Sequence, residues 1–219
     1  IPNFKSKKYN YFLNQFLKKS PNLKILDQQE WLEYEFHKIP SYMLNNNLMA
    51  LQKIRLEYSF QFRIKRIYEV LISVVLIFIT LPLVFICSIL IYLTDGGSIL
   101  YSQKRTGLNQ RIFKITKLRT MKINSEENGP QWCERNDKRI TKIGEIMRIL
   151  RIDELPQLFS VIIGDMSLIG PRPERPEIDM KLTKKIPYYN LRYKIKPGLS
   201  GWSQVNYPYG ASLEDAKIK

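Results

Sequence analysis

The sequence is poor in the residues that most often carry acid-base and metal chemistry. Its 219 residues include one histidine, His37, and two cysteines, Cys87 and Cys133. The cysteines lie far apart in unlike surroundings, which excludes the spacings of a disulfide framework, a zinc site or a redox motif and indicates a reducing compartment. His37 is remote from the acidic pair described below, which argues against Ser-His-Asp and zinc-hydrolase chemistry. Any catalysis must therefore use carboxylates.

Acidic residues are also few, and one stretch has no charge at all. The chain carries 35 Lys and Arg against 20 Asp and Glu, a net charge of +15. A strongly basic protein usually meets nucleic acid, anionic lipid or phosphorylated small molecules. Residues 70–93 contain no charged side chain, with 12 basic residues before them and 23 after. The positive charge therefore flanks a neutral segment.

The neutral segment is long enough to enter a membrane. As a helix, 24 residues would reach about 36 Å, against a hydrocarbon core of about 30 Å. Pro82 falls in its middle and predicts a kink, and Thr80 can deepen the bend by bonding back to a preceding carbonyl. Because both flanks are basic, the positive-inside rule places them on one face. This favours a re-entrant helix hairpin bent at Pro82 over a straight span, and a buried core helix ranks third.

The rest of the chain predicts a mixed α/β fold that is mostly helical, with one short β-hairpin. We expect strands at 98–103 and 111–118, helices at 140–150 and around 181–185, and a loop at 196–206 carrying Trp202 and Gln204. The predicted regions are a polar leader with juxtamembrane helices at 1–62, a re-entrant membrane hairpin at 63–95, and a cytoplasmic catalytic domain at 96–219. The start at Ile1 and the helix-like last residues predict a piece of a longer protein.

The chemistry concentrates in residues 148–173. Asp153 and Glu154 are predicted to begin a helix, because Pro156 is tolerated only in a first turn and an apolar run follows it. A helix N-terminus favours anions, so Asp153 should stay ionised and a phosphate could bind there. Arg148 precedes Asp153 by five residues, and Arg172 lies in a rigid setting between two prolines.

A purely structural interpretation fits the same residues. Asp153 would then be an ordinary N-cap, Glu154 a first-turn dipole partner, and the arginines solvated charges. On this stretch alone the structural interpretation is the stronger of the two.

Five motifs follow one another along the second half of the chain. They are Tyr101-Ser-Gln-Lys-Arg-Thr-Gly, Phe113-Lys-Ile-Thr-Lys-Leu-Arg-Thr-Met, Arg151-Ile-Asp-Glu-Leu-Pro-Gln-Leu, Gly164-Asp-Met-Ser-Leu-Ile-Gly-Pro-Arg-Pro and Lys196-Pro-Gly-Leu-Ser-Gly-Trp. Taken together, they resemble the bacterial sugar transferase family, the monotopic polyprenyl-phosphate phosphoglycosyl transferases, and the resemblance covers about 65–219. The resemblance implies transfer of a sugar 1-phosphate from a UDP-sugar to undecaprenyl phosphate, at the cytoplasmic face of the bacterial inner membrane. Such transfer starts exopolysaccharide, capsule or O-antigen assembly.

The resemblance also implies roles for single residues. Asp153 would attack the phosphorus and carry a covalent phosphosugar, and Glu154 would hold Mg²⁺. Arg148 and Arg172 would bind phosphates and spread the developing charge. Membrane lipid would be a further partner, nucleic acid would not, and a homo-oligomer stays open. The remaining substrate-binding candidates are Pro171, Pro173, Lys117, Arg119, Asp165 and Gln157.

Two positions depart from the family pattern. Leu81 precedes the bend proline where relatives often have Ser, and Tyr207 to Gly210 replace a Gly and Arg of many relatives. Two other functions remain to be tested against the transferase. One is a basic, membrane-attached module for nucleic acid or anionic lipid, and the other is a pyrophosphatase-like hydrolase.

Overall fold

The computed structural model describes residues 34–35, 60–125, 137–206 and 216. The chain divides into two units, Ile1–Asn45 and Asn46–Lys219, and all elements named below belong to the second. Nearly all of the predicted leader, with its juxtamembrane helices, lies outside the described residues. So do most of the loop after Ile123 and the residues after Asn206 except Ala216.

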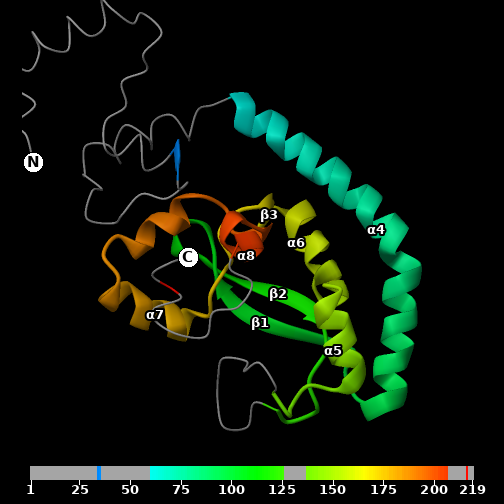
Figure 1. Cartoon of the computed structure of the whole chain (residues 1–219). Helices are drawn as coiled ribbons and strands as arrows, with labels where there is room; N and C mark the ends of the chain where they lie inside the picture. The colour runs from blue at the N-terminus through cyan, green and yellow to red at the C-terminus, as the bar shows by residue number, and fades with distance from the viewer. Residues whose placement is uncertain (1–33, 36–59, 126–136, 207–215, 217–219) are drawn as a thin grey trace, which may run out of the picture. The chain divides into compact units, whose positions relative to one another are not determined.

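The neutral segment forms part of one long helix, α4 (Phe60–Asp95), which has Pro82 in its interior. The most apolar 18-residue window within Phe60–Thr94 has a mean hydropathy of 3.1, and this helix is long and apolar enough to cross a membrane. As predicted, Thr80 Oγ1 donates to the Leu76 carbonyl, at 2.7 Å. The helix is curved in Figure 1 but continues through Pro82, so the predicted pair of helices is not confirmed. Proline removes only one helical hydrogen bond, and the neighbouring turns are intact.

The predicted hairpin is confirmed. β1 (Leu100–Thr106) and β2 (Ile112–Leu118) pair antiparallel, with Leu100 opposite Leu118 and Thr106 opposite Ile112. The turn between them contains a short 3₁₀ helix, η2 (Leu108–Gln110), with Asn109 and Gln110 in the left-handed backbone region.

Short elements complete the domain and cover the hairpin (Figure 1). The predicted helix at 140–150 is confirmed as α5 (Lys142–Ile149). The predicted loop at 196–206 is wrong, because these residues form the strand β4 (Gly198–Ser200) and the short helix α8 (Trp202–Asn206). Leu199 packs with a core cluster, and β4 pairs in parallel with β3 (Ser167–Ile169). The elements after β2 are α5 (Lys142–Ile149), η3 (Ile152–Gln157), α6 (Leu158–Ile163), β3 (Ser167–Ile169), α7 (Pro176–Lys185), η4 (Tyr189–Lys194), β4 (Gly198–Ser200) and α8 (Trp202–Asn206).

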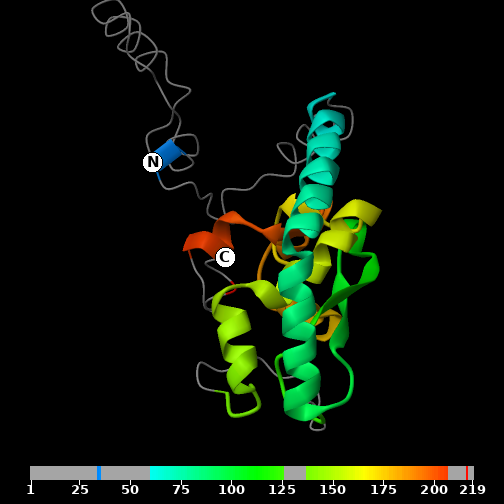
Figure 2. The same cartoon turned by 90° about the vertical axis from the view of Figure 1, so that its right-hand side faces the viewer.

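The helix α4 packs against this domain near both of its ends, and Figure 2 shows it passing along the face that carries α5 and α6. Near its start, Arg66 donates to the carbonyls of Val161 and Ile162, at 2.5 and 2.7 Å. Near its end, Cys87 and Ile91 join a core cluster with Leu118, Met147 and Ile152. Only 11% of its most apolar window is buried, so most of its hydrophobic surface faces outward.

Candidate active site

The acidic pair lies in the sharp connection between α5 and α6. Arg151 adopts a left-handed backbone, with a φ of 59°, which ends α5 and redirects the chain. The sequence predicted that a helix begins at Asp153 and Glu154. In the structure the helical segment begins one residue earlier, at Ile152, and its first part is the 3₁₀ helix η3, which contains Asp153, Glu154 and Pro156. η3 packs on β2, and both carboxyl groups interact electrostatically with Lys117 of that strand.

Asp153 is buried, and one of its carboxyl oxygens lacks a hydrogen-bond partner among the described residues. Its side chain is 5% exposed, and Oδ1 has no hydrogen-bond partner among the described residues. Burial raises the pKa of this carboxyl, and the neighbouring Glu154 raises it further against the opposing charges of Lys117, Arg148 and Arg151. Burial thus opposes the field of the helix terminus, which the sequence analysis expected to favour the ionised form of Asp153.

Glu154 has the opposite environment. Arg172 Nη2 donates to its Oε1 at 2.9 Å, and Arg151 Nη1 donates to its Oε2 at 3.3 Å. Burial alone would raise the pKa of Glu154, but the two arginines and Lys117 leave it below the ordinary value. Two adjacent carboxyls thus have pKa values moved in opposite directions, a pattern typical of sites that divide chemical roles between two acids.

Basic side chains surround Asp153 from the strand side. Burial, followed by the charge of Arg148, lowers the pKa of Lys117 to about 8, despite the attraction of Asp153. The Lys117 ammonium lies 5.5 Å from the centre of the Tyr101 ring. Arg148 is oriented by its Nε, which donates to Thr120 Oγ1 at 2.8 Å. The structure therefore brings together Asp153, Glu154, Arg172, Arg148 and Lys117.

Other predicted site residues lie in different settings. Arg119 donates to the carbonyl of Gly96, at the end of α4. Asp165 is exposed after α6, and Gln157 is buried in η3. Pro171 and Pro173 flank Arg172 as predicted and line a small crevice with it.

The sequence did not identify Arg105 and Arg151 as residues of the site. Arg105 Nη1 donates to the carbonyl of Pro173 at 3.0 Å and lies 3.6 Å from Glu174. Burial lowers the pKa of Arg105 to about 10. The only available signal was its place in one of the five motifs. Arg151 gave a signal through its position beside the acidic pair, but its turn conformation could not be read from the sequence.

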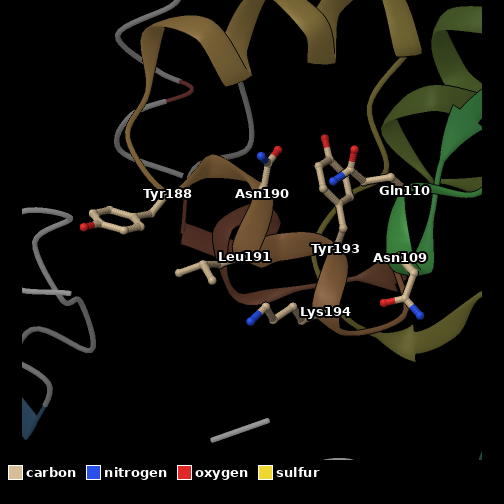
Figure 3. A pocket seen from close by; sticks show the side chains of 7 residues that line it. All are labelled: Asn109, Gln110, Tyr188, Asn190, Leu191, Tyr193 and Lys194. Carbon is tan, nitrogen blue, oxygen red and sulfur yellow. The ribbon is translucent and has the colours of Figure 1, made fainter. Parts of the chain in front are cut away.

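A cavity of about 500 Å³ lies elsewhere, between η2 and η4 (Figure 3). Asn109, Gln110, Asn190 and Tyr193 line it with Tyr188, Leu191 and Lys194. It is at the turn end of the hairpin, whereas Lys117 is at the other end of β2. Five residues of strand separate Lys117 from the turn, or about 17 Å at the usual rise. The cavity is therefore distinct from the acidic pair.

The acidic pair suits Mg²⁺. Among the described residues no group of three or more His, Cys, Asp and Glu side chains occurs. Mg²⁺, however, keeps several waters and is often bound by one or two carboxylates plus substrate phosphates. Asp153 Oδ1 has no hydrogen-bond partner among the described residues, and Arg151, whose contact with Glu154 is longer than that of Arg172, is 50% exposed. The donor set therefore fits this ion together with a diphosphate.

Comparison with known proteins agrees with the motifs. The family model described as bacterial sugar transferase matches residues 60–219, which include α4 and the whole candidate site. The chain belongs to the bacterial sugar transferase family. The match covers 160 of 219 residues, so membership applies to most of the chain.

Curated members of the family share substantial identity with the chain. It is 44% identical over 156 residues to the UDP-N-acetylgalactosamine-undecaprenyl-phosphate N-acetylgalactosaminephosphotransferase of Aeromonas hydrophila, covering 71% of the chain and 37% of the relative. It is 46% identical over 129 residues to a Bacillus subtilis protein named putative undecaprenyl-phosphate N-acetylgalactosaminyl 1-phosphate transferase, covering 59% and 72%. It is 42% identical over 143 residues to the UDP-glucose:undecaprenyl-phosphate glucose-1-phosphate transferase of Caulobacter vibrioides, covering 64% and 53%.

Proposed function

We propose that this chain transfers a sugar 1-phosphate from a UDP-sugar to undecaprenyl phosphate, and so initiates the assembly of an exopolysaccharide, capsule or O-antigen. The observation that carries the proposal is the buried, incompletely bonded Asp153 beside Glu154, with Lys117, Arg148 and Arg172 around them. Membership of the family and the names of the relatives support the same reaction.

Asp153 acts as the nucleophile. Its carboxylate attacks the phosphorus that bears the sugar, an Asp–phosphosugar bond forms, and the bond to the UMP oxygen breaks so that UMP leaves. A phosphate oxygen of the lipid then attacks the same phosphorus and restores the carboxylate. Because Oδ1 has no hydrogen-bond partner to release, little reorganisation is needed before attack.

The basic residues hold and neutralise phosphate oxygens. Arg172 offers a planar guanidinium that is already oriented by Glu154, and Arg148 is oriented by Thr120. Lys117 adds a compact charge beside Asp153, which favours the ionised nucleophile. Glu154 would bind Mg²⁺ with Asp153 close by, and such an ion would shield diphosphate charge from the incoming carboxylate.

The membrane segment enters and leaves on the cytoplasmic side of the inner membrane. Arg66, near the start of α4, contacts α6, and Ile91, near its end, packs with β2 and α5. The 36 residues of α4 span about 54 Å. A perpendicular span would therefore draw the charged catalytic domain into the bilayer, whereas a shallow or re-entrant insertion leaves both contacts intact.

The test is UMP release from a UDP-sugar by the purified protein in detergent or nanodiscs. We expect release that depends on Asp153, and mass spectrometry should find a phosphosugar adduct on that residue when no lipid acceptor is present. An active preparation in which Asp153→Asn releases UMP at the normal rate would contradict the proposal. Continuous turnover without acceptor would indicate a hydrolase, and no turnover with tight binding to nucleic acid would indicate a binding module.

A further inference from the structure

The segment that carries Arg172 has an unusual means of support. Residues 171–175 form neither helix nor strand. Pro171 and Pro173 have no backbone N–H, so the segment has few donors with which to join a sheet. Its position must therefore depend mainly on what binds its carbonyl groups.

Four successive carbonyls of this segment have identified donors. Gly198 N donates to Pro171, and Thr106 N donates to Glu174, both at 3.0 Å. Between them, Arg192 Nη2 donates to the Arg172 carbonyl at 2.5 Å, and Arg105 Nη1 donates to the Pro173 carbonyl at 3.0 Å. Two guanidinium groups, from η4 and from β1, thus hold adjacent carbonyls at the residue that contacts Glu154.

Arg192 is itself fixed by a buried network. Its guanidinium lies 4.7 Å from the centre of the Tyr189 ring and also donates to the Tyr189 hydroxyl. That hydroxyl donates to Asp179 Oδ1 at 3.4 Å, and both Tyr189 and Asp179 are buried. A side chain with these restraints transmits its position to the carbonyl that it binds.

We infer that Arg192, assisted by Arg105, is a positioning residue that aims the Arg172 guanidinium through its backbone. The inference rests on the proposed function, in which Arg172 binds a substrate phosphate. Neither Arg192 nor Arg105 needs to touch the substrate in this role. Their contribution should vanish when Arg172 has no oriented guanidinium to present.

A double-mutant cycle tests this dependence. Arg192→Lys keeps the charge but cannot donate to Tyr189 and to the Arg172 carbonyl with the same fork. We expect it to lower kcat/KM for the UDP-sugar by about tenfold or more, since small misplacements of binding groups are costly. In an Arg172→Lys background, the same change should cost less than about twofold, which shows coupling rather than general damage.

Two further measurements keep the test decisive. Lys194→Gln is the matched control, because Lys194 is on the same element but lines the cavity in Figure 3. Lys194→Gln should change kcat/KM by the same small factor in the native protein and in the Arg172→Lys background. UDP-dependent thermal stabilisation of the four proteins reports binding without turnover, so the cycle can be read even where activity is very low. Equal losses from Arg192→Lys in both backgrounds, or no loss in either, would overturn the inference.

The two proposals fail in distinguishable ways. A protein that loses UMP release on Asp153→Asn but shows no coupling between Arg192 and Arg172 supports the reaction and refutes the positioning role. A protein whose UMP release survives Asp153→Asn refutes the proposed mechanism. The UDP-binding cycle would then still measure whether Arg192 orients Arg172.

Discussion

Two buried carboxyl groups in this protein differ sharply in their partners. Glu69, where α4 meets β3, is 7% exposed, and Asp153 in η3 is 5% exposed. Glu69 Oε1 accepts hydrogen bonds from Ser167 Oγ and from the Leu168 N–H at 3.2 Å, and lies 3.5 Å from Lys65 Nζ. Asp153 Oδ1 accepts none from the described residues.

The comparison separates a carboxyl with structural partners, Glu69, from the proposed nucleophile, Asp153. A buried polar group normally has its partners, and leaving one without them costs free energy. Glu69 follows this rule and joins α4 to the domain. Asp153 breaks it, and a protein tolerates such a cost where an incoming ligand supplies the missing contact. Substitution of the two residues should therefore have opposite consequences.

The largest effect is expected from Asp153→Asn. Loss of the nucleophile should lower UMP release by at least about a thousandfold. Stability should not fall, because the pKa of Asp153 is raised in the folded protein. Such a group contributes stability below its unfolded pKa, and this is lost as the pH rises through its folded pKa. Near pH 7 the asparagine protein should melt at the same or a higher temperature, and a clear decrease would contradict the comparison.

The second prediction concerns the lysine beside each carboxyl. The activity of the native protein should fall on the acid side as the raised pKa of Asp153 is crossed, and on the alkaline side near the Lys117 pKa of about 8. Lys117→Met should remove the alkaline limb, move the acid limb to higher pH and reduce kcat/KM by about a hundredfold. Profiles of kcat/KM from pH 5 to 10 measure all three effects.

Lys65→Met provides the matched control for this experiment. Lys65 is close to Glu69 and 46% exposed, but it is not part of the Asp153 group. Its loss should leave both limbs of the profile in place. An alkaline limb that persists in the Lys117→Met protein would show that another group controls it.

The third prediction concerns Glu69, the carboxyl that has its hydrogen-bond partners. Glu69→Gln should reduce stability by about 2 kcal/mol, since hydrogen bonds to charged groups contribute more than neutral ones. The melting temperature should fall by about 4 to 8 °C for a chain of this size. The folded protein should keep most of its kcat. Glu145→Gln, at an exposed site on α5, serves as the control, and a large loss of kcat with unchanged stability would contradict a structural role for Glu69.

The sequence identified the residues of the candidate site better than the residues that hold them in position. Asp153, Glu154 and Arg148 could be grouped because they are close along the chain, and the hairpin followed from two short β-like runs on either side of residues 107–110. Arg172 stood out through its two prolines. Arg105 and Arg192 did not, because their acceptors are backbone carbonyls 68 and 20 residues away, and every residue has such a carbonyl. Glu69 adjoins the neutral segment and resembles an ordinary solvated flank until the fold brings Ser167 against it.

The smallest effect is expected from Thr120→Val. Glu69 is held by direct contacts, whereas the groups around Asp153 depend on supports such as the bond from Arg148 Nε to Thr120 Oγ1. Valine keeps the shape of threonine and loses the hydroxyl, so Arg148 should be less well aimed and kcat/KM should fall by about three- to tenfold. Thr116→Val removes a hydroxyl from β2 that pairs with Ser102 and not with Arg148, and it should have little effect. Equal losses in the two proteins would mean that hairpin stability, and not the aim of Arg148, limits the reaction.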